Sequence, residues 1–566
     1  MKITWTVVIA LISFEIANAQ TYTWTGTNSS DWNTGSNWVN NAVPGSTGAN
    51  ANVASFTTTT GSTTPNLSAS ETVKELTFLA GAPAYTLTTT AGQTLTLDGD
   101  TSSASATVIL DSSTATETIN GAVIITDSLS TAYNTNLSIV SGGNLVFGTS
   151  SSLTFTAESP SMASTSYGNM SIDGAFILNT TGVTTLPTFL WNPTAGILYY
   201  DPTSQSVSGA YLRSVGAGVI ELQTAFAGTE IEITGNGGSN VSAAGGEVYL
   251  DANGLNSTTQ VLMNGQKGGS LATPYIGTYT FGANASGTAS MTQSGAISIS
   301  VGSYNEDTDY FDVAANNTLT VSGKISGTTS ATGTLAVNKI SAGTLILSNS
   351  ANSFGTATTT VVAGKLLITG TTSTGGAITV DSGAALGGAG GTINATGVTV
   401  ASGGGLSVSG GGAVTAGTMT LALTGGTNTL DISATAGTGT GELTFVLGTA
   451  HDEVKLTSGT LVIGNGLLSL ADFTITNGSG FGAGTYVLFD GNTSGITGSL
   501  AANGLSGTVD GYAVTLNEGL DTSGNADIDL IVAAVPEPGS LALLFFGGAA
   551  LLLMGWRQRR LQGLRI

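Results

Sequence analysis

The chain of 566 residues contains 82 glycines, one histidine and no cysteine, and its formal net charge is −22. The absence of cysteine excludes disulfides and thiol catalysis, and a single histidine excludes a multi-histidine metal centre. An acidic chain of this kind is unsuited to nucleic acid, so we expect no nucleic-acid partner.

The first nineteen residues have the pattern of a secretory signal peptide. Lys2 supplies a short positive region, residues 3–14 are mostly apolar, and Ala17 and Ala19 form a small-x-small cleavage motif. The mature chain is therefore expected to begin at Gln20. Residues 20–534 hold 32 of the acidic residues and 7 of the Lys and Arg residues, a charge of −25 that suits solubility outside the cell.

Residues 20–65 are rich in tryptophan, with Trp24, Trp32 and Trp38 close together. This segment resembles the opening of surface proteins with autotransporter-associated β repeats. Two interpretations remain open. The tryptophans can stack on sugar rings, or they can form an N-terminal cap that seals the end of a β-solenoid.

Residues 66–318 contain short segments in which apolar and polar residues alternate, separated by Gly, Asn, Asp or Ser. Leu76–Phe78, Leu95–Leu97 and Leu153–Phe155 are examples. Alternation with a period of two predicts strands, and no sustained helical period appears outside the two chain ends. A sandwich, a barrel array and a β-solenoid all fit this pattern, and we expect an irregular solenoid here.

Residues 319–430 are the most regular part of the chain and resemble the autotransporter-associated β-strand repeat. The matching positions are Lys339, Gly343, Thr344, Leu345, Leu347, Asn352, Phe354, Gly364 and Leu366. Two departures exist: Ile340 stands where the repeat usually has glycine, and the spacing from Asn352 to Gly355 is short. The resemblance implies a passenger-like β-repeat region.

The segments that follow repeat every twenty residues. Ile378 corresponds to Val398, and Gly383 corresponds to Gly403. Twenty residues fit one coil of a parallel β-helix, with apolar residues stacked inward and glycines at the corners. We predict an all-β chain, a right-handed parallel β-helix or β-solenoid of short Gly/Thr/Ser-rich repeats, with one C-terminal transmembrane helix.

Strands are expected to continue through residues 431–534 as a C-terminal β region and cap. Residues 535–566 then resemble the PEP-CTERM protein-sorting signal of Gram-negative bacteria. Its three parts are a Pro-Glu-Pro triplet, an apolar stretch and a basic cluster, here carried by Pro536, Glu537, Pro538, residues 541–556, Arg557, Arg559 and Arg560. With the flanking residues, the stretch predicts a membrane span at about 540–556, with the arginines on the cytoplasmic side.

The sorting resemblance implies cleavage near the triplet by an exosortase and a surface or extracellular-matrix destination. The expected partners are exosortase and the secretion machinery. Exopolysaccharide or other surface glycans are candidate ligands. The inner membrane would hold the chain only transiently. Exosortase processing would leave the mature protein without its last helix.

Two acidic groups are candidates for chemistry. Glu221, Glu230, Glu232 and Glu247 could serve a glycosidase or a cation, and residues 305–312, with Asp307, Asp309 and Asp312, could hold Ca²⁺. Solvated strand faces and loops are the alternative for both. No other cofactor is expected.

Catalytic motifs are otherwise missing from the sequence. His451 stands alone among charged neighbours, and neither a nucleophile elbow nor a P-loop occurs. We therefore expect a non-enzymatic structural or adhesive surface protein. The alternatives are a surface polysaccharide lyase or glycosidase using the Glu221–Glu247 region, and a true autotransporter passenger, which would need a C-terminal barrel that this chain replaces with one short apolar stretch.

Overall fold

The computed structural model describes residues 20–562 with internal gaps. The gaps are residues 46–51, 59–60, 100–104, 127–133, 157–160, 163–168, 179–187, 192–194, 236–242, 265–274, 302–304, 329–332, 374, 413 and 535–537. The chain forms two compact units, residues 1–336 and residues 337–566, which divide within strand β32 (Thr334–Ile340). The signal peptide predicted at residues 1–19 lies outside the described residues.

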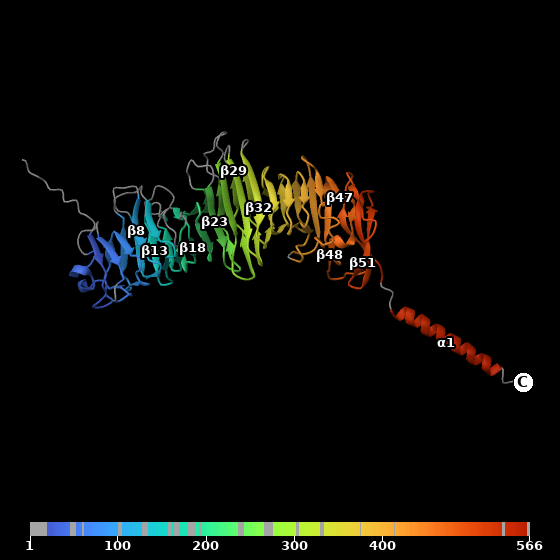
Figure 1. The fold of residues 1–566 in the computed structure, drawn as a ribbon, viewed down its shortest axis with the longest axis horizontal. Helices are drawn as coiled ribbons and strands as arrows, with labels where there is room; N and C mark the ends of the chain where they lie inside the picture. Colours follow the sequence, from blue (N-terminus) through green and yellow to red (C-terminus); the bar gives the residue numbers. More distant parts are fainter. Residues whose placement is uncertain are drawn as a thin grey trace, which may run out of the picture. The chain divides into compact units, whose positions relative to one another are not determined.

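In the first unit, parallel strands build three sheets, and most coils of the chain contribute one strand to each sheet in turn. Figure 1 shows the strands of successive coils following one another along the unit. The first sheet contains β1 (Gln20–Thr23), β2 (Asn52–Phe56), β5 (Glu75–Phe78), β8 (Ser105–Asp111), β11 (Asn134–Ile139), β14 (Ser161–Met162), β17 (Thr188–Trp191), β20 (Tyr211–Val215), β22 (Glu230–Thr234), β25 (Gln260–Asn264), β28 (Ile297–Ser300) and β31 (Ile325–Thr328).

The second sheet of this unit contains β3 (Asn66–Leu67), β6 (Thr86–Thr89), β9 (Thr116–Asn120), β12 (Asn144–Phe147), β15 (Asn169–Ile172), β18 (Ile197–Tyr200), β21 (Val219–Leu222), β23 (Ala243–Leu250), β26 (Tyr275–Ala283) and β29 (Asn305–Val313). The third face holds β4 (Glu71–Val73), β7 (Thr94–Asp98), β10 (Ala122–Thr126), β13 (Ser152–Phe155), β16 (Ala175–Leu178) and β19 (Ser204–Ser206), and after a break β24 (Asn256–Ser257), β27 (Ala289–Gln293) and β30 (Asn317–Val321).

The second unit repeats this three-strand coil. One sheet contains β34 (Asn352–Ser353), β37 (Thr371–Ser373), β40 (Thr392–Ala395), β43 (Thr418–Leu423), β46 (Glu453–Ser458) and β49 (Gly484–Asp490). Another contains β35 (Thr358–Val361), β38 (Ile378–Val380), β41 (Val398–Val400), β44 (Thr429–Asp431), β47 (Thr460–Leu468) and β50 (Ile496–Leu500). The third contains β33 (Thr344–Leu347), β36 (Gly364–Ile368), β39 (Ala384–Gly387), β42 (Gly405–Ser407), β45 (Leu443–Leu447) and β48 (Phe473–Asn477).

Side-chain alternation along the strands builds the core. In β10, Val123 is buried between Leu95 of β7 and Leu153 of β13, and the register pairs these three residues directly. Ile124, the residue between the two buried positions of β10, is only half buried. A column of inward side chains therefore runs from coil to coil, and its burial supplies the stability that a single coil lacks.

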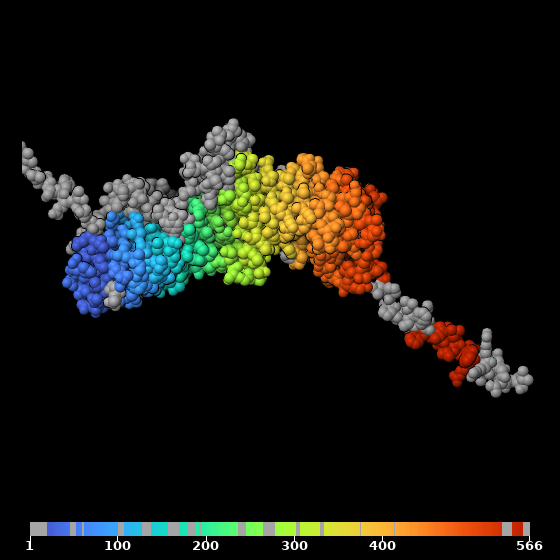
Figure 2. Space-filling view, in the orientation of Figure 1, coloured from blue at the N-terminus to red at the C-terminus, as the bar shows by residue number. Residues whose placement is uncertain are grey.

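The twenty-residue repeat predicted for the second unit is confirmed. Ile378 pairs with Val398 and Val380 pairs with Val400, while Gly383 N–H donates to the carbonyl of Gly403 at 2.7 Å. Figure 2 shows the sequence colours in successive bands along each unit, as expected where each coil packs against its sequence neighbours. The predicted all-β parallel solenoid is the fold of both units.

The second unit ends with a change of strand direction. Strands β51 (Ser506–Val509), β52 (Tyr512–Leu520) and β53 (Ala526–Val532) form an antiparallel meander, and β53 pairs antiparallel with β49. An antiparallel strand against the last parallel strand covers the edge on which another coil would form. This meander is the C-terminal cap of the sheet.

Helix is scarce in the described residues. Three single-turn 3₁₀ segments occur at Gly35–Asn37, Val39–Asn41 and Leu470–Asp472, and the α-helix α1 spans Pro538–Gln562. Within the described part of the chain, no helix combines the length and hydropathy required for crossing a membrane. The transmembrane helix expected at about 540–556 is thus not found among these residues.

Candidate functional site

The predicted sorting segment follows the last strand directly. The N–H of Ala533 still donates to the carbonyl of Ala513 at 2.9 Å, and α1 begins at Pro538. Pro536 and Glu537 lie outside the described residues, and nothing is described of the Arg559 and Arg560 side chains. Arg557 lies in α1 and is exposed. The folded cap and the sorting segment are therefore joined by a short connection.

The predicted cleavage site lies at the start of the first unit. Ala17 and Ala19 fall outside the described residues, whereas Gln20 is exposed and opens β1, where it pairs with Asn52. The part of the chain predicted to remain after cleavage thus begins with the first strand of the solenoid.

The tryptophans of the N-terminal segment are enclosed. Trp24 and Trp32 are 0% exposed and Trp38 is 2% exposed. The Trp38 ring lies edge-on to both neighbours, with centroids 5.0 Å from Trp24 and 4.7 Å from Trp32, and its Nε1 donates to the carbonyl of Trp32 at 2.7 Å. Rings without accessible faces are unavailable to sugars, so this arrangement supports the cap rather than a sugar-stacking surface.

The four candidate glutamates do not converge. Glu230 and Glu232 share the outward face of β22, as their spacing predicts, while Glu221 and Glu247 lie on β21 and β23 of a different sheet. Glu232 forms an ion pair with Arg213, whose Nε donates at 2.6 Å. Burial and the neighbouring Glu232 raise the pKa of Glu230, and the ion pair occupies Glu232. The four carboxylates are therefore divided between two sheets, and Glu232 of the pair on β22 is salt-bridged.

The acidic segment 305–312 lies in strand β29 rather than in a loop. Asp307 and Asp309 are buried, while Asp312 on the opposite face accepts a hydrogen bond from the Tyr249 hydroxyl at 3.2 Å. Burial, together with Asp307, raises the pKa of Asp309 well above its usual range. A strand sends alternate side chains to opposite faces, so Asp312 cannot join the other two carboxylates around one cation.

The single histidine has a packing role. The His451 ring lies edge-on to Tyr486, with centroids 5.7 Å apart. Its neighbour Asp452 is buried and accepts hydrogen bonds from the Ser409 hydroxyl at 2.7 Å and the Val446 N–H at 2.9 Å. These contacts tie the loop that holds Asp452 to strand β45 (Leu443–Leu447) and to the turn that holds Ser409.

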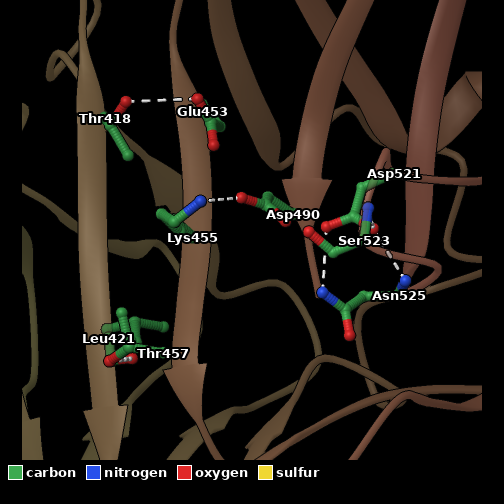
Figure 3. Close-up of polar contacts among 9 residues, drawn as sticks. All are labelled: Thr418, Leu421, Glu453, Lys455, Thr457, Asp490, Asp521, Ser523 and Asn525. Carbon is green, nitrogen blue, oxygen red and sulfur yellow. Dashed lines mark hydrogen bonds and ion pairs between the residues drawn. The ribbon is translucent and has the colours of Figure 1, made fainter. Parts of the chain in front are cut away.

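A carboxylate cluster that the sequence analysis missed lies in the C-terminal cap. Asp490 ends β49, Asp521 follows β52, and Asp527 lies in β53, and one oxygen from each lies within 4.8 Å of the others. Figure 3 shows Lys455 of β46 directed at Asp490, with Asp521 facing Ser523 and Asn525 of its own loop. The sequence does hold one signal for part of this cluster. Oxygen-bearing side chains stand at every second position from Asp521 to Asp527, namely Asp521, Ser523, Asn525 and Asp527.

The ionisable side chains at the cluster have pKa values shifted in different directions by their surroundings. Burial, followed by the nearby Asp490, Asp529 and Asp521, raises the pKa of Asp527 to about 6. Hydrogen bonds, that from the Asn525 N–H above all, lower the pKa of Asp521. The hydrogen bond to Asp490 raises the pKa of Lys455. The cluster therefore concentrates negative charge at one edge of the cap.

Comparisons with known proteins agree with one part of this description. Residues 534–560 match the family model for the PEP-CTERM protein-sorting motif, which confirms the predicted sorting signal. No curated protein matches the chain. The autotransporter-associated repeat family stays a prediction.

A solved structure, the Haemophilus influenzae Hap adhesin, aligns with 11% identity over 86% of this chain and 64% of that chain, with a TM-score of 0.15. The chain thus spans less than two thirds of the adhesin's length. A similarity this low carries no argument about this chain. The chain carries a PEP-CTERM sorting motif directly after a parallel β-solenoid.

Proposed function

We propose that this chain is an exported structural or adhesive protein of a Gram-negative bacterium, delivered to the cell surface or extracellular matrix through exosortase processing. The observation that carries the proposal is the sorting motif at residues 534–560, placed directly after the last strand of the solenoid. Exosortase and the secretion machinery are the partners that this motif requires.

The outer surface of the coils supports an adhesive or structural role. Thr360, Thr379 and Thr399 pair in register on successive coils and face outward, while Val361, Val380 and Val400 form the matching buried column. Rows of hydroxyl groups offer repeated hydrogen-bond donors and acceptors at the strand spacing of about 4.8 Å. Such a surface suits a neutral polymer, so surface glycans are the proposed ligands.

Processing is tested by mass spectrometry of the chain recovered from the surface of a host with an exosortase and from a matched strain without one. We expect a mature C-terminus near Pro538 in the first strain only. The double variant Pro536→Ala/Pro538→Ala should block the cleavage. Leu564→Ala, beyond the matched residues, is the control and should be cleaved normally. Surface-exposed protein that keeps Arg560 would contradict the proposal.

The adhesive role is tested separately by binding of the chain to a glycan array, alongside a turnover assay on acidic polysaccharides. We expect binding without turnover. Turnover that disappears in a Glu230→Ala/Glu232→Ala variant would instead support the polysaccharide-enzyme alternative. Turnover that survives in this variant would exclude those two glutamates as its catalytic pair.

A further inference from the structure

The antiparallel end of the second unit brings together three aspartates from separate parts of the sequence. Asp490 is the last residue of β49, and the register places Asp527 of β53 directly opposite it. The turn between β52 and β53 adds Asp521. One carboxylate oxygen from each residue lies within 4.8 Å of the other two.

Asp527 has a buried oxygen without a partner. The side chain is 4% exposed, and its Oδ1 has no hydrogen-bond donor among the described residues. The Gly491 N–H donates to the carboxylate, so only one of its two oxygens is accounted for. Buried carboxylate oxygens normally have a donor or a cation, because a buried unpaired charge is costly. The oxygen without a donor thus points to a missing positive group.

The net charge of the three aspartates and their neighbours indicates the charge of the missing positive group. Three carboxylates face one ammonium group, that of Lys455, which pairs with Asp490. Lys455 forms its ion pair with Asp490 alone, and Asp529 adds a further carboxylate beside Asp527. Negative charge therefore exceeds positive charge at the cluster, which favours a divalent cation.

We propose that Asp490, Asp521 and Asp527 form a Ca²⁺ site in the C-terminal cap. Three carboxylate oxygens within 4.8 Å of one another can meet at one ion, and calcium accepts such oxygen ligands in flexible geometry at about 2.3–2.6 Å. Magnesium demands near-ideal octahedral geometry and keeps several of its waters, so carboxylates from three separate segments suit calcium better. Water completes the coordination, because three protein oxygens are fewer than the six to eight that calcium takes.

The loop hydrogen bonds orient one of the ligands. Asp521 Oδ1 accepts from the N–H groups of Ser523 and Asn525, both at 2.7 Å, and Oδ2 accepts from the Asn525 side chain at 2.9 Å. These contacts hold the carboxylate at the start of the turn. A bound ion would join this turn to β49 and β53, and so would fix the meander that covers the sheet edge.

The position of the site gives the ion a role in export, and this step rests on the proposed function. Extracellular calcium modules bind with dissociation constants of about 10⁻⁴–10⁻³ M, so a site of this class fills only where calcium is abundant. The cap would therefore become rigid after export, at the strand that leads into the sorting segment. Binding itself does not depend on export and can be tested on purified protein.

The test is titration of the purified full-length chain with CaCl₂ by isothermal calorimetry, together with its thermal midpoint. We expect one calcium ion per chain, a dissociation constant of about 10⁻⁴–10⁻³ M, and a midpoint that rises with calcium. Asp521→Asn and Asp527→Asn should each weaken binding at least about 10-fold. Glu518→Gln, an exposed position in the same hairpin, is the matched control and should bind as the wild type does.

Three results would overturn the proposal: no binding up to 10 mM CaCl₂, undiminished binding in Asp521→Asn, or equal affinity for MgCl₂. Near-UV circular dichroism establishes that each variant is folded. If Asp527→Asn fails to fold, the surface variant Asp521→Asn decides. A chain that binds calcium but is not processed by exosortase would refute the proposed function and leave the site intact.

Discussion

The ammonium group of Lys339 lies 3.2 Å from the carbonyl oxygen of Ala363, one coil further along the chain. It also donates to the carbonyl oxygens of Ile340 at 2.6 Å and Ser341 at 2.7 Å, and the residue is only 1% exposed. A lysine at a matching position of the repeat pattern thus satisfies three main-chain oxygens where two coils meet.

Lys339→Met should destabilise the second unit by about 2–4 kcal/mol, because it keeps the apolar stem but removes charged hydrogen bonds to three carbonyl groups. Differential scanning calorimetry would measure the loss. Lys365→Met is the control, since Lys365 is half buried and its ammonium group donates to one carbonyl, that of Gly410 at 2.6 Å. An equal loss in both variants would contradict the role assigned to Lys339.

Trp38→Ala should destabilise the first unit by about 3–5 kcal/mol, because it leaves a cavity between Trp24 and Trp32. Urea unfolding followed by tryptophan fluorescence would measure the change. Val39→Ala, at a side chain that is 45% exposed, should stay within about 0.5 kcal/mol. If Trp38→Ala lowered glycan binding without changing stability, the cap assignment would be wrong.

Gly387→Ala should destabilise the second unit by about 1–3 kcal/mol. A Cβ atom at this position would lie 1.8 Å from the carbonyl oxygen of Ser407 in the next coil, so the stacked strands must move apart. Gly482→Ala is the matched control, because a Cβ atom there meets nothing within 4 Å. Calorimetry should find Gly482→Ala unchanged or more stable by up to about 1 kcal/mol.

The first unit should become less stable as the pH rises from about 4 to about 7. Asp111 and Glu117 are buried, and burial raises the pKa of each carboxyl to about 7. The folded state therefore holds protons that the unfolded chain releases near pH 4. Each proton contributes a loss of at most about 1.4 kcal/mol per pH unit between these values, with no further loss above pH 7.

Glu117→Gln should flatten this pH dependence, because the amide keeps the shape of the side chain without ionising. Urea unfolding at a series of pH values between 4.5 and 8 would measure the slope. Glu306→Gln, an exposed position in the same unit, should keep the wild-type slope. A wild-type stability that rises between pH 5 and 7 would show that these carboxylates are not protonated in the folded state.

Much of the fold was predictable because its signal is local. Alternating apolar residues such as Val123 and Ile125 identify a strand and its buried face, since side chains of a strand alternate between faces. The repeat from Ile378 to Val398 identified one coil, and the Pro-Glu-Pro triplet with its basic cluster identified the sorting motif. These features depend on neighbouring residues or on a fixed spacing.

The failures have a different origin. The spacing of Glu230 and Glu232 correctly predicted that they share one face of a strand. Sequence spacing could not predict that Glu221 lies in another sheet. The segment 305–312 looked like a loop because it is acidic, whereas pairing with β26 makes it a strand. In both cases the outcome depends on hydrogen-bonded pairing with segments distant in the sequence.

The sequence alone determined the strands, their buried faces, the length of the regular coil and the sorting motif, because short-range alternation and repetition specify them. Only the tertiary structure decided that Asp490 lies beside Asp527, 37 residues further along. That contact requires β53 to add antiparallel to a parallel sheet, and strand direction is set by hydrogen bonding between distant segments.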